Sequence, residues 1–279
     1  MPKCKRLVPF HLGAALAATG VVAGTAAAAT ITGTPGPDRI LGTNDADGIE
    51  TLAGHDVVRA RGGDDTVNGG PDSDRLWGQA GNDTLHGRQG PDRLFGGIGD
   101  DILVGDVAEA GDQVSRDRLL GGAGNDTLLG GDGHDRLRSG PGNDIADGQG
   151  GPDVMVGGPG DDTQNGGPDG DVILGNLGRD VSDGGDGNDH LWILVHADVT
   201  GPGDIAGDVA RGGPGNDVIH ARDGELDVVS CGDGVDVALL DMADAIEGAT
   251  AETPDGDCER VRRAEPRPDE DAAERDPAS

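Results

Sequence analysis

Two adjacent nine-residue segments, GGAGNDTLL at 121–129 and GGDGHDRLR at 130–138, decide the fold. Each begins with paired glycines, adds a third glycine at position four, and places an aspartate at position six and a leucine at position eight. The pattern returns as GGPGDDTQN at 157–165, GGDGNDHLW at 184–192 and GGPGNDVIH at 212–220. Its consensus is Gly-Gly-x-Gly-x-Asp-x-apolar-x, and such a fixed period indicates a repeat architecture.

One apolar residue, two positions after the aspartate, recurs in most repeats. A helix would need apolar residues every three or four positions, so this spacing excludes helices. A three-residue strand satisfies it, with the middle side chain inward and its two neighbours outward. We therefore expect one short strand per repeat and a six-residue turn between strands.

The turn residues have a chemical consequence. Glycine tolerates the left-handed backbone and close approach that tight turns need. Such a turn can aim several carbonyl oxygens at one point, and the short side chain of aspartate adds a carboxylate there. Oxygen ligands without converging histidine or cysteine are typical of a hard cation, and calcium, which takes six to eight oxygens, is favoured over magnesium.

The repeats resemble the RTX (haemolysin-type) family of calcium-binding nonapeptide proteins, including those exported by high-GC bacteria. The resemblance covers about residues 33–239 and implies a right-handed parallel β-roll, an all-β solenoid with two repeats per coil and two facing sheets. It also implies several calcium ions, each between the turns of repeats i and i+2, so that Asp38 would pair with Asp56, Asp47 with Asp65, and Asp126 with Asp144. The ligands so implied are Asp38, Asp47, Asp56, Asp65, Asp74, Asp83, Asp92, Asp101, Asp126, Asp135, Asp144, Asp153, Asp162, Asp171, Asp180, Asp189, Asp208 and Asp217.

Several repeats depart from the consensus. GTNDADGIE at 42–50 lacks the third glycine, and TLAGHDVVR at 51–59 lacks the leading pair. The step from Asp101 to Asp117 is 16 residues, which predicts an insertion near 105–111, and the repeat around Asp117 lacks turn glycines. A second insertion is expected near 193–202, where Asp198 keeps phase and 193–201 is interpreted as a coil without a good site. One-residue slips follow, and residues 222–239 are expected to be the weakest metal sites.

Composition bounds the function. Glycine makes up 54 of 279 residues, tyrosine is absent, and the formal net charge is −32. A broad aromatic core is therefore excluded, and so is a nucleic-acid binder that works through a basic face. Acid of this density needs cations, without which we expect the chain to be largely disordered.

The first 29 residues are typical of a secretory signal peptide. A basic start (Lys3, Lys5 and Arg6) precedes an alanine-rich apolar stretch and small residues that suit cleavage. The stretch is short and weak for a membrane span, so we expect a secreted, extracellular protein. Cys231 and Cys258 would be its remaining cysteines, which predicts one disulfide, with an intermolecular bridge as the alternative. The Cys-Gly repeat and the later Cys-Glu-Arg-Val resemble the ends of exported RTX-like proteins, which supports this pairing.

The domain organisation follows from these boundaries. We expect a signal peptide at 1–29, RTX repeats at 30–239, a small C-terminal cap at 240–263 and a disordered acidic tail at 264–279. The cap would cover the open end of the last coil.

No catalytic motif lies outside the repeats, so the sequence predicts a non-enzymatic calcium-binding protein with a structural or surface-interaction role. Two alternatives stay open: a hydrolase that uses the roll as a scaffold, and a binder of polysaccharide or ice. Position seven mixes residue types, which disfavours the second.

Two kinds of outward side chain are candidates for surface contacts. Trp77 and Trp192 at outward position nine are either isolated aromatics or an aromatic docking spot. The arginines that directly follow Asp38, Asp74, Asp92, Asp117 and Asp135 would form basic rows that screen the acid. The expected partners are calcium and an unidentified extracellular protein or glycan, and the protein is expected to be a monomer.

Overall fold

The computed structural model describes residues 28–106, 115–193, 207–249 and 256–264. Most of the predicted signal peptide, most of both predicted insertions and nearly all of the predicted tail lie outside the described residues. The described residues form strands and turns, with no helix among them.

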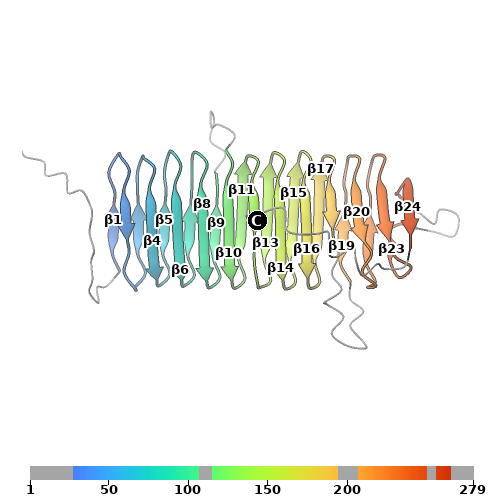
Figure 1. Cartoon of the computed structure of the whole chain (residues 1–279), viewed down its shortest axis with the longest axis horizontal. Coiled ribbons are helices and arrows are strands. Elements are labelled where there is room, and N and C mark those ends of the chain that lie inside the picture. Colours follow the sequence, from blue (N-terminus) through green and yellow to red (C-terminus); the bar gives the residue numbers. More distant parts are fainter. Residues whose placement is uncertain (1–27, 107–114, 194–206, 250–255, 265–279) are drawn as a thin grey trace, which may run out of the picture.

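Two parallel sheets of twelve strands each make up the molecule, and they are formed by alternate strands of the chain (Figure 1). We call them the first and the second sheet. The first contains β1 (Thr30–Thr32), β3 (Gly48–Glu50), β5 (Thr66–Asn68), β7 (Thr84–His86), β9 (Ile102–Val104), β11 (Thr127–Asp132), β13 (Ile145–Gly150), β15 (Thr163–Pro168), β17 (Val181–Asp186), β19 (Val209–Arg211), β21 (Val228–Ser230) and β23 (Ala245–Ile246). The second contains β2 (Arg39–Leu41), β4 (Val57–Gly62), β6 (Arg75–Ala80), β8 (Arg93–Ile98), β10 (Arg118–Ala123), β12 (Arg136–Arg138), β14 (Val154–Pro159), β16 (Val172–Leu177), β18 (His190–Trp192), β20 (Val218–Ala221), β22 (Val237–Leu240) and β24 (Arg260–Arg263).

This is the predicted right-handed parallel β-roll, in which two nonapeptides make one coil. Each strand pairs with the strand two repeats away, so that Leu76 lies beside Leu94 and Thr127 beside Ile145. Successive coils stack along the long axis of the molecule, and the strands of the two sheets run in opposite directions (Figure 1).

The core is a single column of side chains from each sheet. The apolar residue at position eight points between the sheets in almost every repeat, as predicted, and is buried. The fully buried large side chains are Leu76, Leu85, Leu94, Leu103, Leu119, Leu128, Leu137, Met155, Ile173, Leu191, Ile193 and Ile219. Two polar residues in this column, Gln164 and Ser182, are neighbours in the first sheet and are joined by a hydrogen bond of 3.3 Å.

The turns keep one backbone form even where glycine is missing. In the repeat at 121–129, Gly122 and Gly124 have φ of 126° and 135°. In the divergent turn at 51–54, Leu52 and Gly54 occupy the same two positions with φ of 73° and 128°. A branched residue such as leucine pays a steric cost in this region, so the neighbouring coils must hold the turn in place.

Insertions leave the register intact. β8 pairs directly with β10, and the aspartates of these two strands are 25 residues apart rather than 18, so seven extra residues lie between them in the chain. β17 pairs with β19, and Asp180 bonds to Asp208 across 28 residues. Among the described residues no strand separates β17 from β19 or β18 from β20. Residues 194–206, which include Asp198 and nearly all of the segment interpreted as a coil at 193–201, lie outside the described residues.

The C-terminal segment 240–263 adds strands to the roll. β23 pairs with β21 and β24 pairs with β22, both parallel and in register. The segment predicted to be a cap thus covers the preceding coil by continuing both sheets. Leu240 and Ile246 are buried, while Met242 is 69% exposed.

Candidate metal centre

The position-six aspartates form two ladders, one along each edge where the chain enters a sheet. In each ladder the backbone N–H of one aspartate donates to Oδ1 of the aspartate two repeats later, at 2.7–2.9 Å. All eighteen predicted ligands belong to these ladders, and each is at least nine-tenths buried. The edge before the second sheet contains Asp38, Asp56, Asp74, Asp92, Asp117, Asp135, Asp153, Asp171, Asp189, Asp217 and Asp236. The edge before the first sheet contains Asp47, Asp65, Asp83, Asp101, Asp126, Asp144, Asp162, Asp180, Asp208 and Asp227.

The second carboxylate oxygen, Oδ2, is buried without a hydrogen-bond donor in most of these residues. A buried carboxylate oxygen with no partner is costly, so it points to a ligand. Among the described residues this oxygen has no partner at Asp65, Asp74, Asp83, Asp92, Asp101, Asp126, Asp135, Asp144, Asp153, Asp162, Asp171, Asp189, Asp217, Asp227 and Asp236.

Where position one of the turn is glycine, as in most repeats, it leaves a cradle beside this oxygen. A Cβ placed on Gly130 would lie 2.9 Å from Oδ2 of Asp135 and 2.7 Å from the carbonyl oxygen of Gly148. A Cβ placed on Gly69 would likewise lie 2.6 Å from Oδ2 of Asp74 and 2.8 Å from the carbonyl oxygen of Gly87. A carboxylate oxygen of one repeat and a carbonyl oxygen of the repeat above it therefore converge on the space that glycine leaves open.

Burial raises the pKa of these carboxyl groups. Desolvation is the largest cause throughout; it raises the pKa of Asp74 to about 8 and those of Asp92 and Asp153 to about 9, while the backbone hydrogen bond at Oδ1 opposes the shift. Neighbouring aspartates add a smaller like-charge contribution. The charged form is therefore unfavourable without a cation, and a divalent ion beside each pair of turns would reverse this preference.

A model of the RTX calcium-binding nonapeptide repeat (4 copies) matches most of the sequence, at residues 24–58, 41–76, 52–85, 77–107, 115–146, 139–173, 147–181, 156–191 and 202–237. The chain belongs to the RTX calcium-binding nonapeptide repeat family. It is a calcium-binding β-roll protein, as the resemblance of its repeats indicated.

Two further comparisons add little to this assignment. A hyperactive, Ca²⁺-dependent, β-helical antifreeze protein from an Antarctic bacterium is 18% identical over 86% of this chain and 95% of that chain, with a TM-score of 0.38. This likeness is too slight to carry an argument. No curated protein matches the sequence.

The RTX turns of this chain suit calcium by their donor type. Each cradle offers carboxylate and carbonyl oxygens, which are the ligands of a hard cation. The two groups of His, Cys, Asp or Glu side chains that converge closely among the described residues both lie near the C-terminal end of the roll.

Some aspartates of the RTX ladders satisfy Oδ2 from within the protein. Asp38 and Asp47 receive the backbone N–H of Thr34 and Thr43, each at 2.6 Å, and the threonine hydroxyls add further bonds. Asp117 receives the hydroxyl of Ser115 at 3.2 Å. These turns therefore differ in kind from those with an unpartnered oxygen, although the sequence predicts Asp38 and Asp47 as equal members of the set.

The C-terminal coils contain acids that the sequence analysis did not select. Asp227 and Asp236 continue the RTX ladders, and Asp244 and Glu259 end them by accepting the backbone N–H of these two residues at 3.3 and 2.8 Å. The recurring Asp-x-apolar phase could have indicated Asp227 and Asp236. The last two acids follow irregular steps, so only the strand pairing reveals them.

Asp223 brings a third carboxylate to one of these coils. Oxygens of Asp208, Asp223 and Asp227 all lie within 4.8 Å of one another, and all three residues are buried. Burial raises the pKa of Asp208 and of Asp227 to about 9, and the charge of Asp223 adds to both shifts. Asp223 lies in a repeat that is ten residues long, from Asp217 to Asp227, outside the nonapeptide pattern, which is why the repeat consensus does not predict it.

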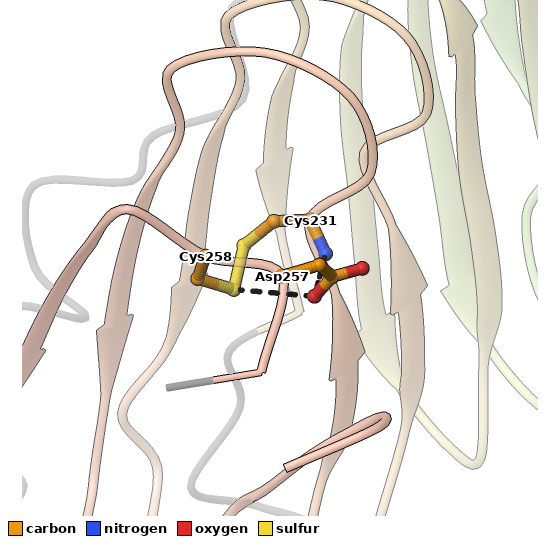
Figure 2. A group of neighbouring side chains, drawn as sticks. All are labelled: Cys231, Asp257 and Cys258. Carbon is orange, nitrogen blue, oxygen red and sulfur yellow. Dashed lines mark hydrogen bonds between the residues drawn. A yellow bond between two sulfur atoms is a disulfide. The ribbon is translucent and has the colours of Figure 1, made fainter. Parts of the chain in front are cut away.

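The disulfide between Cys231 and Cys258 is present, as predicted, with a Cα–Cα distance of 5.2 Å. Figure 2 shows Asp257 beside the bridge, where its carboxylate accepts the backbone N–H of Cys231 at 3.2 Å and that of Gly232 at 3.1 Å. The bridge ties the segment before β24 to the turn before β22. Because both sulfurs are bonded to each other, the close grouping of Cys231, Asp257 and Cys258 is not a thiolate metal site.

In the part of the chain that the structure describes, no helix is long and apolar enough to cross a membrane.

Proposed function

We propose that this chain is a secreted protein that folds when it binds calcium outside the cell and then serves as a structural or surface-interaction element. The observation that carries the proposal is the buried, unpartnered Oδ2 that recurs from turn to turn beside a converging carbonyl oxygen. Secretion is supported by the signal-like first 29 residues and by the disulfide, since disulfides persist in oxidising compartments. No catalytic role is part of the proposal.

The position-six aspartates would hold the ions. The strong set consists of the ladder aspartates whose Oδ2 has no partner, and it includes Asp227 and Asp236, which the sequence analysis did not select. Asp38 and Asp47 would be weaker ligands, because a threonine already occupies Oδ2. Asp223 would add a carboxylate to Asp208 and Asp227, which makes this coil a richer site than its broken nonapeptide pattern predicts.

Calcium would supply the positive charge that makes a buried aspartate stable in its ionised form. The protein residues do the remaining work: Oδ1 holds the coil spacing through the backbone, and the first glycine keeps the cradle open. Without the ion, one apolar side chain per strand leaves the chain with little burial to offset its conformational entropy. Binding free energy then becomes folding free energy.

Circular dichroism of the mature chain tests this proposal. We expect a disordered spectrum at submicromolar calcium and a β spectrum at about 1 mM calcium, the range of weak extracellular sites. Magnesium at the same concentration should be a poor substitute, because it prefers a strict octahedron and keeps its water. A strong β spectrum that persists in excess chelator at neutral pH would refute the proposal.

A further inference from the structure

The outer surface of the second sheet carries an unbroken row of arginines. Arg75, Arg93, Arg118 and Arg136 stand at position seven of β6, β8, β10 and β12 and are direct neighbours in the parallel register. Like charges on neighbouring strands are destabilising, so four in succession are an unfavourable choice for a sheet surface.

Screening of the aspartate ladder does not explain this row. The first sheet has the same buried aspartates before its strands, yet its position seven holds Thr66, Thr84, Ile102, Thr127 and Ile145. If each ladder aspartate needed an adjacent cation, both sheets would carry arginine. The row therefore belongs to one face of the molecule and not to the repeat as such.

A groove of about 380 Å³ runs beside this row, across four successive coils. We call it the arginine groove. Its charged and polar lining comes from Arg75, Arg93, Arg116, Arg118, His55 and Ser73 and from three aspartates of the ladder. Neither Arg75 nor Arg93 forms an ion pair or a guanidinium hydrogen bond with any described residue, and both side chains are exposed.

We propose that the arginine groove and its row bind an acidic polysaccharide of the polyuronate class, laid along the long axis of the roll. Guanidinium groups bind carboxylates in a two-bonded planar geometry, which suits one uronate per arginine. Neighbouring strands of a sheet are about 4.8 Å apart, so the guanidinium groups recur at a short, regular spacing along the roll, which suits a linear chain with closely recurring carboxylates.

A linear ligand with recurring charge fits the row better than a single anion, because the row continues beyond the groove to Arg136. Nucleic acid fits poorly. Its bases would need free aromatic faces. The ring of Trp77 stacks on that of Phe95, with 5.0 Å between the centroids, and the guanidinium of Arg59 lies over the same Trp77 ring, 5.5 Å from its centroid. The two faces of Trp77 are thus in use within the protein.

This inference rests on the proposed function in one respect. Asp56, Asp74 and Asp92 also line the groove, and in their ionised form they would repel a polyanion. Calcium at the ladder would compensate that charge and hold the coils that bring the arginines together. We therefore expect polyuronate binding only in the calcium-loaded protein.

The test measures binding of a short oligogalacturonate by isothermal titration calorimetry to the full mature chain at a fixed calcium concentration. The variant is Arg75→Gln/Arg93→Gln, and the matched control is Arg179→Gln/Arg211→Gln, whose arginines lie at the other edge and in the first sheet. Loss of two charge-assisted contacts should weaken binding by at least about tenfold in the variant and leave the control unchanged. The methyl-esterified oligosaccharide should not bind.

Calcium-dependent circular dichroism of every variant separates the two proposals. If the spectra respond to calcium with the wild-type midpoint and oligogalacturonate still binds equally to wild type and variant, the groove is not the site and the inference falls. An equal loss in the control also overturns it, and so does preferred, arginine-dependent binding of an oligonucleotide or an oligoglutamate. If the wild-type chain itself does not respond to calcium, the proposed function has failed.

Discussion

The position-six aspartate divides its two carboxylate oxygens between two tasks. Oδ1 accepts a backbone N–H from the coil below, as in Asp135, which receives that of Asp117 at 2.7 Å. Oδ2 is left facing the cradle of the first glycine. Glutamate is longer, and among the described ladder positions it stands only at the last rung, at Glu259. The strong bias of the composition toward aspartate over glutamate follows from this geometry.

Asp135→Asn and Asp47→Asn should differ in their effect on calcium binding. Asparagine is nearly isosteric with aspartate but is uncharged and has an amide nitrogen in place of one carboxylate oxygen. At Asp135 the substitution therefore removes the charged oxygen that has no other partner. At Asp47 the same oxygen is held by the backbone N–H of Thr43. We expect the calcium midpoint in circular dichroism to rise several-fold for Asp135→Asn and little for Asp47→Asn. Equal shifts would contradict the division of the ladder into two kinds of turn.

Gly130→Ala tests the cradle directly. Its new methyl group would lie 2.7 Å from the carbonyl of Gly148 and 2.9 Å from Oδ2 of Asp135, which is closer than real side chains come. We expect weaker calcium binding in a titration followed by circular dichroism. Gly48→Ala is the control, because nothing lies within 4 Å of its added methyl group. A wild-type midpoint for Gly130→Ala would show that the cradle is not used.

At the scale of single elements, strand pairing overrides the local sequence of a turn. The turn before β10 lacks the consensus glycines, yet Asp117 keeps its place in the ladder. Ser115 donates to Asp106 at 2.5 Å and to Asp117 at 3.2 Å, and so replaces a turn of glycines with a side-chain network. The period predicted the strands, the core column and the seven-residue insertion. This network involves residues on both sides of the insertion, so a repeat consensus cannot foresee it.

The disulfide should matter most for the last coil. It closes a loop of about 28 residues, for which loop entropy gives about 3–4 kcal/mol. In the Cys231→Ser/Cys258→Ser variant we therefore expect a lower melting temperature of the calcium-loaded protein and earlier proteolysis of β22 and β24 than of the central strands. Limited proteolysis with mass spectrometry would identify the sites. Uniform cleavage along the roll would argue against a local role.

At the scale of the whole molecule, the two faces of the roll carry different chemistry. Pooled over all repeats, position seven mixes arginine, threonine and valine and has no evident purpose. Sorted by sheet, it separates into an arginine row on β6 to β12 and a threonine-rich row on the first sheet. Trp77 and Trp192 share the second sheet but stand on β6 and β18, and Trp192 stacks against His190 and His220. They are therefore not one docking spot.

The raised pKa values predict that the calcium-free chain becomes more structured in mild acid. The folded-state pKa of these aspartates lies above the ordinary value of 3.8, at about 6 for Asp144, about 7 for Asp126 and about 9 for Asp92. The folded state therefore binds more protons, and its stability is greatest below the unfolded pKa and is lost as pH rises through about 6 to about 9. After calcium removal, the β signal should be larger at about pH 5 than at about pH 8. The reverse order would contradict the burial of unpaired carboxyl groups.

The spacing of 18 residues between bonded aspartates also bears on how such a chain can change its length over generations. A duplication of two repeats in the gene adds one complete coil, and every later residue keeps its sheet. A duplication of one repeat exchanges the sheets for everything downstream, so that an arginine row begun on one face would continue on the other. Selection on a surface that runs along one face should thus favour growth in even steps, and the seven extra residues near position 107 are tolerated because they leave that parity unchanged.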